Sequence, residues 1–261
     1  MSVLENVAVL AASSTPTTEF AARIRTEAIP VNPNFSYYFL DLTPSEDDLK
    51  ELVVEPVTGL PPRILELLPP VQMLFVPFLE LQTAKHSGSR TNGRRGTEVV
   101  TNQRPAKPLT HTRVTAEAGE ALLFSMDERD TGECHYRFFQ GIATMVAERW
   151  PDELEKNYVG LVRQELRANV HGEVDEASWE KKIALVERSA AHGTTKALRE
   201  YARQSFIDTL TLYLHGICCD LDVDTGPRQL ASRHLRKRLD MLAAAFPPPK
   251  GYAVFPEDLK N

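Results

Sequence analysis

The sequence predicts an α+β protein: a mostly β N-terminal region with a long basic loop, packed against a C-terminal bundle of about four to five helices. Proline placement is the first reason. Of the 18 prolines, 12 lie between residues 16 and 108, where they exclude mainly helical structure because proline removes a backbone donor and breaks helices. Periodicity is the second, since apolar side chains after residue 130 recur at helical three- and four-residue steps. The expected domains are 1–130 and 131–246, followed by an extended proline-rich tail, 247–261.

Short apolar or β-branched runs bounded by turn residues predict the strands of the first domain. The expected strands are 7–11, 35–41, 50–54, 71–79, 111–117 and 121–126. Pro77 inside the fourth run indicates an edge strand or a bulge, because proline cannot donate to a sheet ladder. Helices are expected over 17–28 and over 60–68, where prolines suit the first helical turn.

Hydrophobic periodicity predicts the helices of the second domain. They are expected over about 131–150, 152–170, 175–191, 195–215 and 228–245. Asp130 and Glu133 have the spacing of a capping box at the start of the first helix. His-Gly pairs beginning at His171, His192 and His215 lie near helix ends, where glycine supplies a left-handed cap.

Composition and cysteine content limit the class of protein. With 42% hydrophobic and 25% charged residues the chain is typical of globular proteins, which excludes a disordered chain or a coiled-coil rod. It has no apolar run near the 18 residues of a membrane span, and its first residues lack the basic start of a secretory signal. Three cysteines, two of them adjacent, fit a reducing compartment. We therefore expect a cytoplasmic protein with no membrane partner.

Cysteine and histidine provide one candidate site. His215 lies three residues before Cys218 and four before Cys219, so on a helix all three face one way. With a second, distant pair they offer a Cys₂His₂ zinc set, whose candidate ligands are Cys134, His135, His215 and Cys218. A Cys–His nucleophile pair is an alternative. Plain core thiols are the favoured interpretation, because free cysteine is among the most buried residue types, and no cofactor is assigned.

Other catalytic signals are absent from the sequence. It contains no Gly-x-Ser-x-Gly, His-Glu-x-x-His, phosphate-binding or dinucleotide motif. The alternating carboxylates of residues 220–226 lack the glycine and glutamate that a calcium loop needs. The acids Asp127, Glu128, Asp130 and Glu133 are explained by the positive N-terminal end of the next helix. The sequence therefore favours a protein that is not an enzyme.

Charge is the most informative feature. Between residues 85 and 113 seven cations oppose one acid, a net of +6 in a chain of net charge −6. The candidate nucleic-acid-binding residues are these seven: Lys85, Arg90, Arg94, Arg95, Arg104, Lys107 and Arg113. The part over 85–96 has no large apolar side chain and is expected to be a flexible loop. A second basic segment, 228–238, has five cations and no acid, and we expect it to form a solvated helix face.

Because the sequence contains no strong catalytic motif, the charge pattern is the basis for predicting a function. We expect a non-enzymatic subunit of a larger protein complex that binds a polyanion, nucleic acid and in particular RNA, through the basic loop. One alternative is a Cys/His-dependent hydrolase, with or without zinc. Another is a protein–protein adaptor whose loop and tail become ordered on a protein partner.

Overall fold

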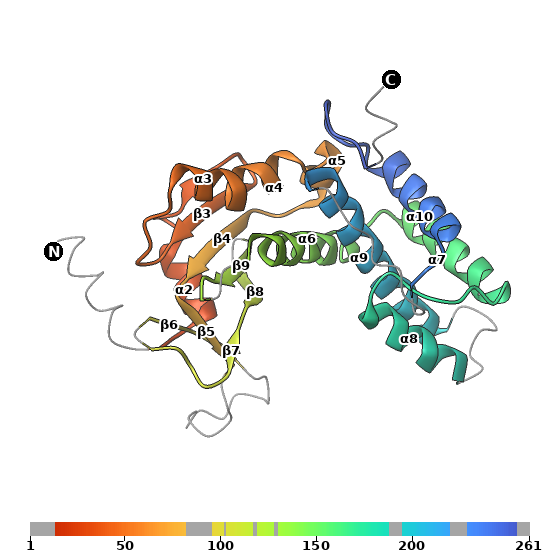
Figure 1. The fold of residues 1–261 in the computed structure, drawn as a ribbon, viewed down its shortest axis with the longest axis horizontal. Helices are drawn as coiled ribbons and strands as arrows, with labels where there is room; N and C mark the ends of the chain where they lie inside the picture. The colour runs from red at the N-terminus through yellow and green to blue at the C-terminus, as the bar shows by residue number, and fades with distance from the viewer. Residues whose placement is uncertain are drawn as a thin grey trace. The chain divides into compact units, whose positions relative to one another are not determined.

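The α+β class is confirmed, with both sheets in the N-terminal half and most helices in the C-terminal half (Figure 1). The structure is a computed structural model that describes residues 14–81, 96–101, 103–116, 119–127, 130–187, 195–219 and 229–254. The predicted strand at 7–11, the loop at 85–96 apart from Gly96, and the acidic segment 220–226 lie outside these residues. The chain divides into two compact units, residues 1–57 with 69–134, and residues 58–68 with 135–261.

A five-stranded mixed sheet organises the first unit, in the order β2-β3-β4-β9-β8. Its three central strands run parallel: β3 (Phe35–Phe39), β4 (Val71–Val76) and β9 (Gly119–Ser125). The edges β2 (Ile29–Pro30) and β8 (His111–Ala116) are antiparallel to their neighbours. Parallel neighbours need a long crossover connection, and 31 residues of chain separate the end of β3 from the start of β4.

A smaller antiparallel sheet completes the core of this unit. It has the order β1 (Thr15–Pro16), β6 (Thr97–Val100), β5 (Phe78–Leu81) and β7 (Pro108–Leu109). Helix α2 (Thr17–Ile24) buries Phe20, Ala21 and Ile24 completely. They share one apolar cluster with Leu74 of the larger sheet and Leu79 of the smaller one. One helix therefore supplies the apolar surface that both sheets bury.

Two predictions for this region are wrong. Residues 50–54 are not a strand but a π-helical turn, η1 (Lys50–Val54), between α3 (Glu46–Leu49) and α4 (Glu55–Thr58). A capping box upstream, in which Ser45 and Asp48 bond each other's backbone, starts a helix that continues through the β-branched pair. The run at 71–79 divides at Pro77 into β4 and β5, which join different sheets and are both interior strands.

Helices make up the second unit. They are α5 (Pro62–Leu67), most of α6 (Thr131–Ala147), α7 (Asp152–Arg167), α8 (Glu176–Glu187), α9 (Lys196–Cys218) and α10 (Ser232–Ala245). At the start of α6, Asp130 Oδ1 accepts the Glu133 N–H at 3.1 Å, as its spacing predicts. The cap expected at Gly216 is wrong, because α9 continues to Cys218. No helix among the described residues is long and apolar enough to span a bilayer.

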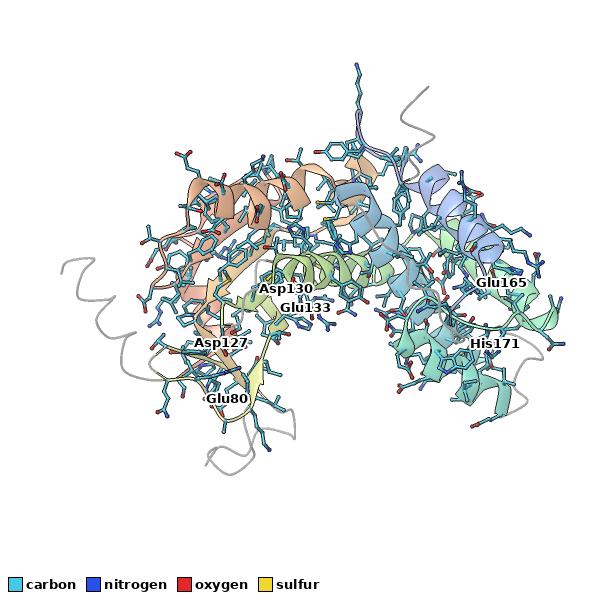
Figure 2. The ribbon with its side chains drawn as sticks, in the orientation of Figure 1. Glu80, Asp127, Asp130, Glu133, Glu165 and His171 are labelled. Carbon is cyan, nitrogen blue, oxygen red and sulfur yellow. The ribbon has the colours of Figure 1, made fainter. Side chains whose placement is uncertain are left out.

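The centre of this unit is an ionic cluster around Arg238 of α10, whose side chain is completely buried. Its guanidinium donates to Glu165 on α7 at 2.6 Å and to Glu173, between α7 and α8, at 2.8 Å (Glu165 is labelled in Figure 2). It also donates to the Ser205 hydroxyl of α9 at 2.8 Å. The expectation that the cations of 228–238 form a solvated face is therefore wrong for Arg238.

Further groups complete this cluster. Lys182 of α8, itself buried, donates to the Gly172 carbonyl at 2.7 Å and to Glu173 at 3.4 Å. The Tyr201 hydroxyl of α9 also donates to Glu173. Burial raises the pKa of Glu173, but the hydrogen bond and charge of Arg238 and the charge of Lys182 outweigh it, and the pKa is lowered. The two cations and the two carboxylates balance, so the cluster buries no net charge.

Asp208 of α9 is another buried acid, and the hydrogen bonds to its carboxylate come from neutral groups. Its carboxylate accepts the Ser178 N–H at 3.0 Å and the Gln204 side-chain amide at 2.8 Å. Desolvation by burial nevertheless dominates and raises its pKa to about 6. The folded protein therefore stabilises the protonated form of the Asp208 side chain relative to its ionised form, more than the unfolded chain does.

Replacing Arg238 tests the role of the ionic cluster. Arg238→Leu leaves two buried carboxylates without their main partner, and breaking a buried pair costs about 3–5 kcal/mol. We expect a loss of that size in the free energy of unfolding, measured by urea denaturation. Arg236→Ala on the same helix removes an exposed pair with Asp240 and should cost less than about 1 kcal/mol. Equal losses in the two variants would contradict this account.

The buried Asp208 carboxyl predicts a pH dependence. Its pKa is higher in the folded protein than in the unfolded chain, so protonation favours the fold as the pH falls through 6. Between pH 7.5 and 5 the wild type should gain about 1 kcal/mol of stability relative to Asp208→Asn, which cannot take up this proton. The measurement is urea denaturation of both proteins at the two pH values. A stability difference that stays the same at both would show that burial does not perturb Asp208.

Candidate functional site

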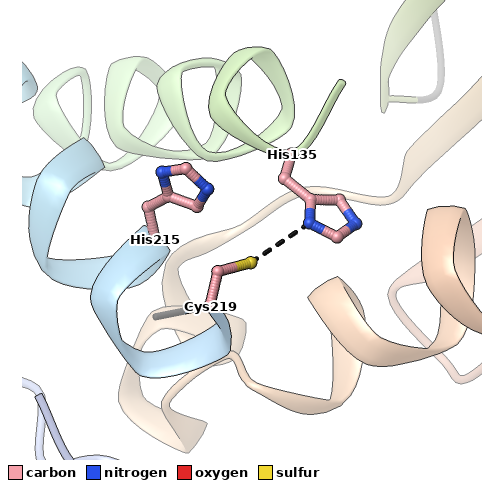
Figure 3. A group of neighbouring side chains, drawn as sticks. All are labelled: His135, His215 and Cys219. Carbon is pink, nitrogen blue, oxygen red and sulfur yellow. Dashed lines mark hydrogen bonds between the residues drawn. The ribbon is translucent and has the colours of Figure 1, made fainter. Parts of the chain in front are cut away.

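Three potential metal ligands converge within the second unit (Figure 3). His135 lies in the first turns of α6, His215 lies in the last turn of α9, and Cys219 follows that helix. The Cys219 N–H donates to the His215 carbonyl at 2.8 Å, which ties the cysteine to the helix end. The site therefore joins two helices and brings together His135 and Cys219, which are 84 residues apart in the chain.

The three donor atoms lie close together. His135 Nδ1 and Cys219 Sγ are 3.2 Å apart (dashed line in Figure 3). The ligand atoms of His135, His215 and Cys219 are all within 4.8 Å of one another. Which ring nitrogen carries a proton depends on the tautomer, so the distance alone does not assign donor and acceptor.

Aromatic side chains surround the two imidazoles. Phe139 is completely buried, and its ring centre lies 5.8 Å from the ring centre of His215 and 6.5 Å from that of His135. Tyr136 meets His215 edge-on at 6.3 Å, and its hydroxyl donates to Asp175. His135 is buried, whereas His215 and Cys219 are partly exposed. The apolar wall favours fixed ring positions and leaves the sulfur reachable from solvent.

Hydrogen bonds to the Cys219 sulfur change its acidity. The bond from the Cys218 thiol is the largest influence, and bonds from both His135 and His215 act in the same direction. Together they outweigh burial, which alone would raise the value, and they lower the pKa of Cys219 to about 3. The lowered pKa favours the thiolate form of Cys219, which is the form that binds metals and acts as a nucleophile.

The structure brings together part of the predicted ligand set. His135 and His215 are members of the cluster, but its third member is Cys219 in place of Cys218. Cys218 is its immediate neighbour in the chain but is not one of the three converging residues. Cys134 is not one of the three converging residues, although it precedes His135. Helical spacing alone allowed either Cys218 or Cys219 to approach His215. In the structure α9 ends at Cys218, and it is Cys219 that joins the cluster.

The basic residues are placed less favourably for a polyanion. Arg104 is held by Asp127 at 2.6 Å, and Arg113 by the buried Glu120 at 3.0 Å (Asp127 is labelled in Figure 2). Lys107 is exposed. The other four predicted cations, Lys85, Arg90, Arg94 and Arg95, lie outside the described residues. Two of the three described cations thus have an acidic partner within the protein.

A groove of about 850 Å³ lies in the second unit between α5, α7 and α10. Small residues, among them Gly160 and Ala244, leave room in it, and a Cβ at Gly160 would meet nothing within 4 Å. Its lining also includes Leu161, Met241 and Phe246. Both signs of charge occur along the lining, so the groove does not favour a charged ligand of either sign.

Comparisons with family models, with curated protein sequences and with solved structures found no significant match to this chain. A functional assignment therefore depends on the chemistry of its own residues.

Proposed function

We propose that the protein binds a divalent metal ion through His135, His215 and Cys219, and that the preferred ion is zinc. The observation that carries the proposal is the convergence of their ligand atoms within 4.8 Å. With metal–nitrogen distances of about 2.0–2.1 Å and a metal–sulfur distance of about 2.3 Å, ligands of a tetrahedral zinc ion lie about 3.3–3.8 Å apart. The cluster therefore needs only small side-chain adjustments to surround an ion.

The donor types support this choice of metal. Two imidazoles and one thiolate suit zinc and similar ions, whereas magnesium, calcium and manganese prefer oxygen ligands. The partly exposed sulfur gives an ion a route of entry, and the apolar wall around Phe139 resembles the shell that holds metal ligands in place. Zinc is accordingly the ion to test first.

The arrangement of the two imidazoles favours a metal over a cysteine hydrolase. A nucleophilic cysteine needs one base, and the base is in turn oriented by a third group. Here the ligand nitrogens of both His135 and His215 lie within 4.8 Å of the same sulfur, so neither serves as the orienting group of the other. Two imidazoles directed at one thiolate are typical of a ligand set.

Metal content tests the proposal. The purified full chain, equilibrated with zinc and dialysed, should retain about one ion per chain by elemental analysis. Cys219→Ser and His135→Ala should weaken zinc binding by more than about 100-fold, the upper range for groups that only support a ligand. Cys134→Ser is the matched control and should bind zinc as the wild type does. No retained zinc, or equal affinity in Cys219→Ser, would refute the proposal.

Polyanion binding is a second candidate function, supported by the sequence charge of +6 over residues 85–113. We propose it for nucleic acid within a larger protein complex. The ion pairs of Arg104 and Arg113 shift the expected contacts to Lys85, Arg90, Arg94 and Arg95, with Lys107 as a fifth cation. Such contacts act through phosphates and carry little sequence information.

Salt dependence tests this second proposal. If Arg94 and Arg95 contact phosphates, their joint replacement by alanine removes about two contacts, and the slope of log K against log salt for a single strand should flatten by roughly 1.4. The measurement is a titration of labelled RNA at several salt concentrations. The control is Arg23→Ala with Arg25→Ala, an equal charge change at two exposed positions on or next to α2. Absence of binding at about 50 mM salt, where attraction is strongest, would exclude polyanion binding by the isolated protein.

A further inference from the structure

We propose that Tyr136 is a positioning residue for the metal site, because its ring, held at the hydroxyl by Asp175, sets the orientation of the His215 imidazole. This inference rests on the proposed metal binding and goes beyond it, since it assigns a role to a residue that is not a ligand. Groups that orient a coordinating histidine from outside the ligand set commonly contribute about 10–100-fold to metal affinity.

The His215 imidazole is oriented by its aromatic neighbours. An imidazole coordinates a metal ion through one ring nitrogen, so its ring must be turned toward the other ligands. Two rings from α6 meet it. The ring centre of Phe139 lies 5.8 Å away with 39° between the ring planes, and that of Tyr136 lies 6.3 Å away at 69°. Aromatic pairs favour particular relative orientations, so the His215 ring depends on how these two rings are held.

The two neighbouring rings are held in different ways. Phe139 is completely buried, so core packing fixes it. Tyr136 is partly exposed, and packing alone constrains it less. Its hydroxyl donates to the Asp175 carboxylate, and the guanidinium carbon of Arg137 lies 5.3 Å from its ring centre. The hydrogen bond therefore restrains the ring of Tyr136 at the end farthest from the α6 backbone.

Asp175 is itself fixed by the start of α8. Its carbonyl accepts the Ser178 hydroxyl and the Trp179 N–H, each at 3.0 Å. The Ser178 N–H in turn donates to the buried carboxylate of Asp208 on α9, also at 3.0 Å. The acceptor of the tyrosine hydroxyl is thus tied to the helix that carries the imidazole.

Zinc affinity after removal of the hydroxyl tests the proposal. Tyr136→Phe keeps the ring and removes its hydrogen bond to Asp175, so we expect zinc binding to weaken about 10-fold, the lower end for groups that support a ligand. Tyr213→Phe is the matched control, because it removes another tyrosine hydrogen bond, from α9 to the Phe246 carbonyl at 2.6 Å. It should bind zinc as the wild type does. The measurement is competition for zinc between the full chain and a chromophoric chelator at fixed pH.

Asp175 provides an independent set of variants. Asp175→Asn keeps an oxygen acceptor and should retain most of the zinc affinity, whereas Asp175→Ala should weaken it about as much as Tyr136→Phe does. Because Asp175 acts on the site through the tyrosine hydroxyl, the double variant should bind zinc no more weakly than either single variant. Additive losses in the double variant would contradict this coupling.

The outcomes separate this proposal from metal binding itself. A wild type that binds no zinc would overturn both. Equal zinc affinity in the wild type and Tyr136→Phe would overturn the positioning role and leave metal binding in place. Equal weakening in Tyr136→Phe and Tyr213→Phe would also overturn the positioning role, because a general loss of tyrosine hydrogen bonds in the unit would then explain the effect.

Discussion

The second unit depends on the burial of one arginine. Arg238 reaches Glu165 and Glu173, and through Glu173 the cluster extends to Lys182 and Tyr201. These groups come from α7, α8, α9, α10 and the segment between α7 and α8, so one network fixes four helices against one another. Because an uncompensated buried charge is costly, no helix can shift far without losing a partner. Pairing two cations with two carboxylates makes this burial tolerable.

Helix α9 connects this network to the candidate metal site. Ser205 contributes to the ionic cluster, and His215 lies ten residues further along, about 15 Å down the helix axis. A helix held firmly at one end presents its other end in a defined position. His135 meets it from α6, where Phe139 packs against the His215 ring. The three potential ligands are thus placed by the core of the unit, and such preorganisation would favour the proposed binding of an ion.

Local patterns predicted the fold where local forces decide it. The capping spacing of Asp130 and Glu133 marked the start of α6, and the proline at 62 marked that of α5. Prediction failed where residues outside a segment determine its conformation. Val53 and Val54 favour a strand by their own propensity, yet the cap at Ser45 commits the backbone to a helix. Strands of two residues, such as β1 and β7, are too short to show any alternation.

Long-range pairing explains what the sequence could not show about the sites. Glu165 and Glu173 precede Arg238 by 73 and 65 residues, so a local count of cations treats a core residue as a surface one. Arg104 and Arg113 are likewise offset by acids that only the fold brings near. A charge count therefore overstates the cations that remain to attract a polyanion. The argument for the cysteine–histidine set does not depend on a count of charges. It depends on the distance between the ligand atoms, and those of His135, His215 and Cys219 lie within 4.8 Å of one another.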